Sequence, residues 1–583
     1  MKSRFSLIIV VLALAGVATA HKSKLARELQ NKAGSDAVNV IVQFKAAPTA
    51  DDEQRVVKHH GKHNGDLTLV HAMMVSLPAN EADRLSDEPT VKFISPDRKI
   101  HAHLTNTAPA INAPYAWSSG LDGMGIGVAV IDSGIVERKS LSSVNKSDLH
   151  KWGSGGDTRI VYRKSWINDG FGSDDAFGHG THVAGIIAGN GFNSSGQGNF
   201  QTLQGVAPNA QLIDLRVLDA NGQGVDSDVI SAIQTAISLK SKYNIQVINL
   251  SLGRPVYESY TVDPLCQAVE AAYQAGIVVV VAAGNDGRDN SAGTNGYGTI
   301  TSPANDPYVI TVGAMKSMGT PTRTDDLIAS YSSKGPTVID HIAKPDIVAP
   351  GNLVSSFMGN VSTTTLATTY PQNIVPMSYY QTGGSSAASP YFILSGTSMA
   401  APAVSGAVAL LLEAQPGLTP DQVKARLMKT AYKTFPQSST YTDPATGITY
   451  NDQYDAFTVG AGYLDIQAAL QSTDVSTGLA KSPVVQYDPT TQSVYFVNDS
   501  FAVWGGSSPA WSSFAVWGGS AFVGDGGQFA VWGGSSQWAS FAVWGGSASW
   551  GDDNDGGFFA VWGGNTIQSG NAPTSDTMIN GDN

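Results

Sequence analysis

Three short motifs contain side chains that can carry out acid–base and nucleophilic chemistry. "GVAVIDSGI" at 127–135 is an almost continuous apolar run that ends in Asp132. "GHGTH" at 178–182 places His179 and His182 three residues apart, and "LSGTSMAAP" at 394–402 contains Ser398. A carboxylate, an imidazole and a hydroxyl are the groups that together make a serine nucleophilic, with the imidazole as general base.

Each motif also has an alternative interpretation. Asp132 is compatible with a turn or cap, and Ser398 with a helix N-cap. Histidines at i and i+3 could share a metal, but zincin helices use i and i+4 with a glutamate between them, and here Gly180 and Thr181 fill the gap. "GTSMA" lacks the second glycine of the G-x-S-x-G elbow, which disfavours the α/β-hydrolase fold.

The surrounding residues predict the elements that position these groups. The apolar run predicts a buried parallel strand that delivers Asp132 at its carboxyl end, where α/β sheets place their sites. The residues after "GHGTH" predict a helix that begins near His179. "AVSGAVALLLEAQ" predicts a second helix, with Ser398 at its N-terminus among unpaired N–H groups and the positive end of the dipole.

The three motifs occur in the order Asp, His, Ser, and together they resemble the active-site signatures of the subtilisin-like serine proteases. "VVVVAAGNDG" at 278–287 is similar to the strand and turn that carry the oxyanion-hole asparagine of that family. The resemblance covers roughly residues 105–470. It implies an α/β fold with a doubly wound, mostly parallel sheet.

The resemblance also implies residue roles. It makes Asp132, His179 and Ser398 catalytic, and leaves His182 as a packed neighbour. Asn285 and the backbone N–H of Ser398 form the oxyanion hole. The substrate-binding residues implied in the same way are Leu252, Gly253, Ala283, Gly284 and Gly222. A peptide would add as a β-strand to "INLSLG" at 248–253 and "DANGQG" at 219–224, which favours broad endopeptidase activity on protein or peptide substrates.

Composition limits the class of protein. With 583 residues and 42% hydrophobic content the chain can bury a large core in more than one domain. A net charge of −13 disfavours nucleic acid or an anionic membrane as partner. The segment from residue 471 onward has nine Asp, no Glu, one Lys and no Arg, which indicates a domain boundary there.

The N-terminus reads as an export signal, with Lys2 and Arg4 before a short apolar run and "ATA" before His21. The apolar run of about 11 residues is shorter than the ~20 needed to span a bilayer. We therefore expect a protein secreted from a bacterial cell or held at its surface, with no membrane span in the mature form. The single cysteine, Cys266, permits no internal disulfide and is predicted to be a core residue.

Residues 21–104 combine strand-like stretches at 38–45, 73–78 and 91–97 with polar helical stretches. This α+β pattern is similar to the inhibitory prosegments of the same proteases. The resemblance implies that "KIHAHL" lies in the active site as a product-like strand, with cleavage near Leu104; the alternative is an independent binding domain. Seven of the eleven histidines fall within 1–104. We interpret His59, His60 and His63 as solvated loop residues, with acid-driven loosening of the prosegment as a second hypothesis.

No cofactor is expected for catalysis. The loop "NGFNSSGQGNFQTLQG" after the His179 helix contains no carboxylate, which disfavours a tight calcium site there, and structural calcium elsewhere is left open without an assignable metal site. The long Ser/Thr/Tyr-rich segment before Ser398 is expected near the leaving-group side.

"FAVWGG" occurs five times, beginning at residues 501, 514, 529, 541 and 559, and eight of the eleven tryptophans fall between 504 and 562. The unequal spacing disfavours a regular solenoid. It favours a small irregular β module or strands that pack on the protease body, with carbohydrate binding as an alternative. The expected division is a signal peptide at 1–20, the prosegment at 21–104, the catalytic domain at 105–470 and a C-terminal extension at 471–583.

Three rival functions remain open at this point. A catalytically impaired subtilase-fold surface or adhesion protein is one, but the intact set of Asp132, His179, Asn285 and Ser398 argues for an active enzyme. The others are an esterase or acyl-transfer enzyme with the same triad and a maturation protease with one dedicated substrate.

Overall fold

The chain divides into two compact units, Met1–His101 and Ala102–Asn583, which are described separately. The computed structural model describes residues 24–26, 29, 37–96, 104–137, 147–151, 157–291, 293–359, 361–382, 389–444, 446–488, 493–496, 567–568 and 575–582. The expected signal peptide, most of the "KIHAHL" stretch and the FAVWGG repeats lie outside these residues.

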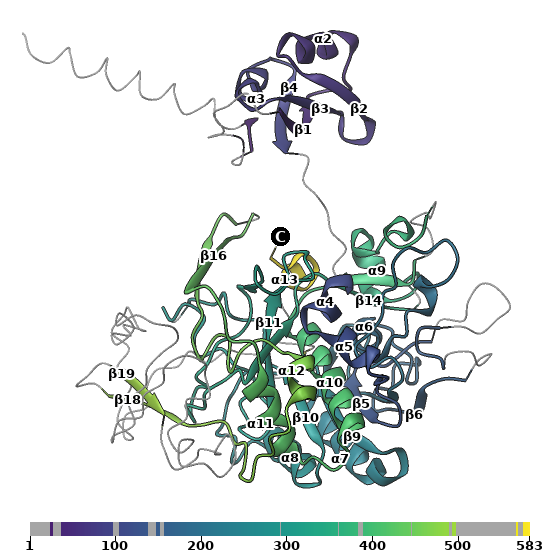
Figure 1. The fold of residues 1–583 in the computed structure, drawn as a ribbon, viewed down its shortest axis with the longest axis vertical. Coiled ribbons are helices and arrows are strands. Elements are labelled where there is room, and N and C mark those ends of the chain that lie inside the picture. Colours follow the sequence, from purple (N-terminus) through teal and green to yellow (C-terminus); the bar gives the residue numbers. More distant parts are fainter. Residues whose placement is uncertain are drawn as a thin grey trace, which may run out of the picture. The chain divides into compact units, whose positions relative to one another are not determined.

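The described residues of the N-terminal unit form a four-stranded antiparallel sheet with two helices (Figure 1). Its strands, in sheet order, are β2 (Lys62–Leu67), β3 (Ala72–Pro78), β1 (Ala37–Phe44) and β4 (Val91–Pro96), and its helices are α2 (Ala50–Lys58) and α3 (Ala79–Ser86). Alternate residues of β1, among them Val40 and Val42, are buried in a separate core. The three expected strands form as β1, β3 and β4, whereas β2 was not expected.

The larger unit is built on an eight-stranded sheet (Figure 1). Seven strands follow the order β12 (Leu327–Ile328), β11 (Ile310–Lys316), β10 (Val278–Ala282), β9 (Ile245–Leu250), β5 (Gly127–Asp132), β7 (Gln211–Arg216) and β6 (Ile160–Ser165), and β13 (Ile347–Pro350) also pairs with β11. All pairs are parallel except β11 with β12. The expected mixed α/β fold with a mostly parallel sheet is confirmed.

Helices cover both faces of this sheet, as the alternation along β5 shows. Val128 and Val130 belong to a core cluster with residues of α6 (His179–Ala188) and α10 (Thr397–Ala414). Ala129 and Ile131 belong to a second cluster with residues of α7 (Asp226–Tyr243) and α8 (Pro264–Gln274). A strand buried on both faces reads as a continuous apolar run, which explains the sequence of β5.

The other elements surround the sheet. The remaining helices are α4 (Leu104–Ala110), α5 (Ala113–Ser118), α9 (Thr365–Thr369), α11 (Pro420–Thr430), α12 (Ile466–Gln471) and α13 (Ser575–Asn580), with short 3-10 turns at Thr68–Val70, Phe192–Ser194, Pro371–Asn373 and Met377–Tyr379. Antiparallel pairs join β14 (Val354–Phe357) to β15 (Tyr391–Leu394), β16 (Ser438–Thr442) to β17 (Thr449–Gln453), β18 (Val485–Asp488) to β19 (Ser493–Phe496), and β8 (Gln223–Gly224) to β20 (Ile567–Gln568).

Two apolar features of the larger unit belong to its core. In the described part of the chain, α10 is the one helix long and apolar enough to cross a membrane, and most of it is buried inside the protein. Cys266 on α8 is fully buried, which confirms its prediction as a core residue.

Residues beyond the composition break at 471 also pack on the larger unit. Ser482 Oγ donates a hydrogen bond to Asp346 Oδ1 at 2.6 Å and accepts one from Lys424 Nζ at 2.7 Å. Val485 is buried in a small cluster with Ala425 and Met428 of α11. The acidic C-terminal stretch that starts at residue 471 therefore includes residues that still pack on the larger unit.

Candidate active site

Asp132 is the last residue of β5, a strand that is buried along its whole length. Its carbonyl oxygen accepts hydrogen bonds from the N–H groups of Val217, at 2.8 Å, and Leu218, at 3.2 Å. The N–H of Ser133 donates to Asp132 Oδ1 at 2.7 Å. These bonds fix the carboxylate at the carboxyl edge of the sheet.

His179 begins α6 and contacts Asp132 directly. Its Nδ1 lies 2.8 Å from Oδ1 and 3.0 Å from Oδ2 of that carboxylate. The helix can approach β5 this closely because the next residue is glycine: a Cβ on Gly180 would lie 2.3 Å from the carbonyl oxygen of Gly134. The "GHGTH" motif therefore brings the imidazole and the carboxylate together.

Electrostatics favour the charged form of His179. Burial lowers its pKa, but the charge and hydrogen bond of Asp132 raise it by more, and the charge of Asp175 adds to them, so the net pKa lies above the ordinary value. A carboxylate can only accept, so Nδ1 carries the proton toward Asp132, and Nε2 of the neutral ring is left as the basic nitrogen.

His182 lies on the same helix but contacts a different part of the fold. Its Nε2 donates to the carbonyl oxygens of Val354, at 3.1 Å on β14, and Phe392, at 3.0 Å on β15. Burial lowers the pKa of His182 to about 3, helped by the nearby His179. The structure therefore places a neutral imidazole between α6 and the β14–β15 pair.

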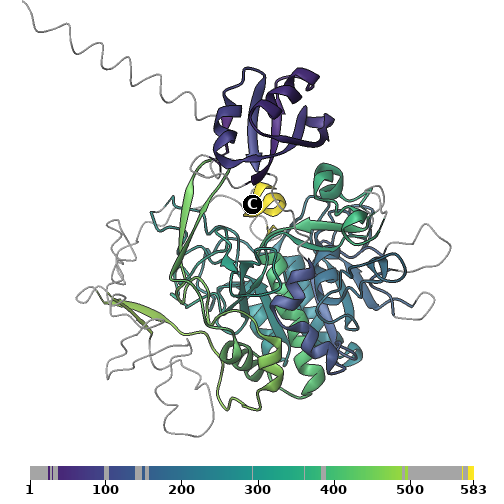
Figure 2. The ribbon, with the colours of Figure 1, turned by 45° about the horizontal axis from the view of Figure 1, so that its top comes forward.

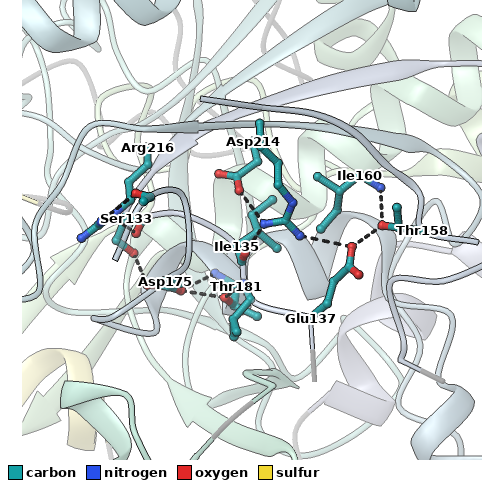
Figure 3. A network of polar contacts seen from close by, with 12 residues as sticks. Ser133, Ile135, Glu137, Thr158, Ile160, Asp175, Thr181, Asp214 and Arg216 are labelled. Atoms are coloured by element: carbon teal, nitrogen blue, oxygen red, sulfur yellow. Dashed lines mark hydrogen bonds and ion pairs between the residues drawn. The ribbon is translucent and has the colours of Figure 1, made fainter. Parts of the chain in front are cut away.

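Asp175 connects the end of β5 to the first turn of α6 (Figure 3). Its Oδ1 accepts from Ser133 Oγ at 2.8 Å and from the N–H of Gly178 at 2.6 Å. Its Oδ2 accepts from the N–H and Oγ1 of Thr181, at 2.8 and 2.7 Å. Ser133 Oγ accepts in turn from the N–H of Gly180 at 2.9 Å. Sequence reasoning missed this buried carboxylate.

A second set of charges supports the loop after Asp132, also seen in Figure 3. Arg216 at the end of β7 donates from Nε to the carbonyl oxygen of Ser133 at 3.0 Å. Asp214 on the same strand accepts from Arg163 Nη1 at 3.0 Å, and Arg163 also pairs with Glu137 at 3.2 Å. Burial raises the pKa of Asp214 well above its usual range, against the opposing charge of Arg163. The residues of β7 and β6 therefore hold the turn that follows β5 in place.

Ser398 is the second residue of α10 and is 3% exposed. Its Oγ donates to the carbonyl oxygen of Ser251 at 3.2 Å, and Ser251 Oγ donates to the carbonyl oxygen of Ser398 at 2.9 Å. Within the described residues no hydrogen bond joins Ser398 Oγ to the His179 ring. Catalytic hydrogen bonds are often long in ligand-free enzymes and tighten when substrate binds, so this geometry is compatible with a serine nucleophile.

Asn285 follows β10 and faces the residues before Ser398. Its Oδ1 accepts from the N–H of Thr397 at 2.8 Å and from Thr397 Oγ1 at 3.1 Å. Its Nδ2 is buried and has no hydrogen-bond partner among the described residues. Buried polar groups are rarely left unpaired, so a donor left open next to a candidate nucleophile indicates a site for an anionic oxygen.

The five expected substrate-binding residues lie on two sides of this cluster. Leu252 and Gly253 follow β9, and Ala283 and Gly284 follow its neighbour β10. The N–H of Gly284 donates to Thr397 Oγ1 at 3.2 Å, which places these turns beside Ser398.

Gly222 lies on the His179 side instead. A Cβ there would be 2.6 Å from the Phe177 ring, whose centroid is 6.3 Å from that of His179.

Metal ligands do not cluster in the described part of the chain, where no group of three or more His, Cys, Asp or Glu side chains could hold an ion. The expectations about calcium and about cofactor-free catalysis stay predictions.

The sequence model of the subtilase family matches residues 123–462. The chain is 36% identical over 356 residues to serine protease AprX of Bacillus subtilis (strain 168). This alignment covers 59% of this chain and 70% of that protein. It is 31% identical over 478 residues to subtilisin E of the same organism, covering 81% of this chain and 100% of that protein. It is 33% identical over 363 residues to subtilisin DY of Bacillus licheniformis, covering 62% and 97%.

Proposed function

The chain belongs to the subtilase family and is a serine-type endopeptidase, and we propose that Asp132, His179 and Ser398 form its catalytic triad. The contact between His179 Nδ1 and Asp132 supports the first pair. The place of Ser398 in the first turn of α10, beside Asn285, supports the third member.

In this proposal Ser398 Oγ leaves the carbonyl oxygen of Ser251 and attacks the scissile carbonyl carbon. His179 Nε2 accepts the hydroxyl proton as the carbon–oxygen bond forms, and Asp132 stabilises the resulting imidazolium. The same proton then goes to the leaving amine, which leaves an acyl-enzyme. Water hydrolyses this ester with His179 again as the base.

The observation that carries the proposal is the unpaired Nδ2 of Asn285. The tetrahedral intermediate places a negative oxygen near Ser398, and a fixed donor there stabilises the transition state more than the ground state. The N–H of Ser398 would be the second donor, because the first N–H groups of a helix have no intrahelical partner. The N-cap alternative for Ser398 does not apply, because the N-cap of α10 is Gly396 and Ser398 is the second residue of the helix.

We propose that substrates are protein chains bound as an added strand. Gly222 with β8 would form one edge, and Leu252 and Gly253 the other, so that main-chain hydrogen bonds supply most of the affinity. Ala283 and Gly284 would line the pocket for the residue before the cut. This mode tolerates many sequences and favours broad specificity.

The decisive experiment compares wild type with Ser398→Ala. We expect wild type to hydrolyse casein and to react with a fluorophosphonate at Ser398, and Ser398→Ala to do neither. A protein labelled by the probe that does not cleave casein would be an esterase or a dedicated processing enzyme. Casein cleavage that survives in Ser398→Ala would overturn the proposed nucleophile.

We further propose that the enzyme is exported as a zymogen, with a signal peptide at 1–20, a prosegment at 21–104 and a catalytic domain from 105. The compact N-terminal unit with its own core supports a separately folding prosegment. The alignment with subtilisin E extends over 478 residues, well beyond the stretch 123–462. Ser398→Ala should therefore accumulate as an uncut precursor, while N-terminal sequencing of wild type should place the mature start near residue 105.

The FAVWGG repeats are proposed to be an accessory to this activity, either as a packing module or as an attachment module outside the cell. Deleting 501–564 should leave kcat per titrated serine unchanged while altering secretion or retention at the cell surface. A deletion that changes none of these properties would remove both roles.

A further inference from the structure

The last residues of the chain return to the larger unit and contact it on two sides of the candidate active site. Ile567 and Gln568 form β20, which pairs with β8, and α13 with the residues after it packs beside β15. Figure 2 shows α13 in yellow at the C label. Neither contact was expected from the sequence, because more than 170 residues separate each segment from its partner.

The first contact is made by backbone. β20 lies antiparallel to β8, with Ile567 opposite Gly224 and Gln568 opposite Gln223. In the described part of the chain β8 has no other strand partner. The neighbouring Gly222 lies against Phe177, next to His179. The edge that a substrate strand would use is therefore paired with a segment of the same chain.

The second contact is a set of side chains that we call the C-terminal socket: Arg288, Ser330, Asn352 and Ser395. The carboxylate of Asp582 accepts from Arg288 Nη2 at 2.7 Å, from Ser330 Oγ at 2.9 Å and from the N–H of Ser330 at 2.8 Å. The N–H of Asp582 donates to Asn352 Oδ1 at 2.8 Å. Asp582 is 1% exposed, so the socket satisfies a fully buried charge.

The residues before Asp582 fit the same socket. The carbonyl oxygen of Met578 accepts from the N–H of Ser395 at 2.8 Å, and Met578 and Ile579 are buried in the main core cluster. Gly581 has φ +57°, and a Cβ there would lie 2.4 Å from both Asn352 Oδ1 and Ser395 Oγ. A side chain would therefore be both strained and blocked at this position.

The socket lies on the oxyanion side of the candidate site. Ser395 comes three residues before Ser398, and Arg288 comes three residues after Asn285. β8 lies on the other side, near His179. Only six residues, 569–574, separate the two contacts in the sequence, so both contacts belong to one short C-terminal segment.

We propose that β20, anchored through residues 575–582 in the C-terminal socket, acts as an intramolecular competitor for the β8 edge of the substrate site. This inference rests on the proposed function, because it identifies β8 as the substrate edge. A tethered segment has an effective concentration on the order of 1 mM, so a Kd of about 0.1 mM would raise KM about tenfold. Competition leaves kcat unchanged, since substrate at saturation displaces β20 from β8 while the socket stays filled.

The test uses the full-length enzyme with a processed N-terminus and a fluorogenic peptide, with active sites titrated by a fluorophosphonate. Asp582→Ala removes the buried charge. Gly581→Val places a side chain against Asn352 and Ser395 and so prevents Asp582 from binding in the socket. Both should lower KM about tenfold at unchanged kcat. Asp157→Asn, which removes an exposed carboxylate elsewhere on the same unit, should behave as wild type.

A second measurement separates competition from a general effect on folding. A synthetic peptide with the sequence of residues 567–583, added to Gly581→Val, should inhibit competitively, and a scrambled peptide should not. Unchanged KM in both variants, or no inhibition by the peptide, would overturn the competitor. Release of the C-terminal peptide from freshly purified wild type would also overturn it.

Failure of the proposed function gives a different result. In that case no variant would show hydrolysis that depends on Ser398, whatever the state of the socket. Hydrolysis that Ser398→Ala abolishes, combined with equal KM values in wild type, Asp582→Ala and Gly581→Val, would retain the protease and remove the competitor.

Discussion

A Cβ atom on Gly396 would lie 3.3 Å from Nδ2 of Asn285, so the absence of a side chain at one residue keeps the amide of the other open. Gly396 also has φ +146°, which disfavours any L side chain. The same amide uses its oxygen to hold the N–H of Thr397. One asparagine thus orients the start of α10 and presents a donor beside Ser398.

Asn285→Asp separates these two tasks, because aspartate keeps the acceptor for Thr397 and loses the donor. We expect kcat to fall by a factor of about 10² to 10³ while KM stays nearly constant. This factor is the one known for loss of the corresponding donor in a subtilisin. The thermal midpoint should stay close to wild type, because the contact with Thr397 remains. Steady-state kinetics on a peptide substrate measures the effect. A kcat within twofold of wild type would remove Asn285 from the oxyanion hole.

Asp175→Asn tests a positioning residue for His179. The negative charge of Asp175 contributes to the raised pKa of His179, so its removal should shift the acid limb of the kcat/KM profile to lower pH. The introduced amide would also turn an N–H₂ group toward donors such as Thr181, which should cost about 1–3 kcal/mol of stability.

The control for this prediction is the neighbouring Asp174→Asn, whose exposed carboxylate is not among the groups that shift His179. It should leave both the pH profile and the stability unchanged. A loss of stability in Asp175→Asn without any shift of the acid limb would assign Asp175 a purely structural role.

Sequence reasoning located the residues whose local pattern contains their role. Asp132 ends an apolar run, and His179 and Ser398 begin apolar helices, so strand and helix ends could be predicted together with the α/β class. The packing of α6 on β5 then brings His179 onto Asp132, which no local pattern specifies. β2 was missed because "KHNGDL" is polar and half exposed and lacks the apolar alternation of β1.

Asp175 and Asp582 were missed for a different reason. Asp175 contacts Ser133, 42 residues earlier in the chain, and Asp582 contacts Ser330, 252 residues earlier. A single carboxylate produces no periodic sequence pattern. Its role depends on hydrogen-bond donors that are distant in the sequence and come together only in the folded protein. In the same way, the histidines of the N-terminal unit could be counted from the sequence but not paired.

His63 gives the N-terminal unit a pH dependence opposite to the acid-loosening hypothesis. Its Nδ1 lies 3.0 Å from Glu53 and its Nε2 2.9 Å from Asp66, and His59 lies between Glu81 and Glu88. The interpretation of both histidines as solvated loop residues is therefore wrong. The hydrogen bond with Glu53, opposed by burial and joined by Asp66, raises the pKa of His63.

A raised pKa in the folded state means that the charged form is bound more tightly there than in the unfolded chain. The added stability is full below the unfolded value near 6.5 and is lost as pH rises through the folded value. Hydrogen exchange of β2 amides in the Ser398→Ala precursor should therefore be better protected at pH 6 than at pH 8. His63→Gln should remove the difference; faster opening at pH 6 in wild type would contradict the assignment.

His182 should make the larger unit sensitive to acid, because its pKa of about 3 is lower than in an unfolded chain. Its contribution is fully present above pH 6.5 and is lost as pH falls toward 3, since the unfolded chain takes up the proton first. His182→Gln keeps an N–H donor for Val354 and Phe392 but cannot titrate. Its thermal midpoint should therefore drop less than that of wild type between pH 7 and pH 4.

Casein hydrolysis at pH 8 should persist in His182→Gln and disappear in His179→Gln, and the reverse pattern would exchange the roles of the two histidines.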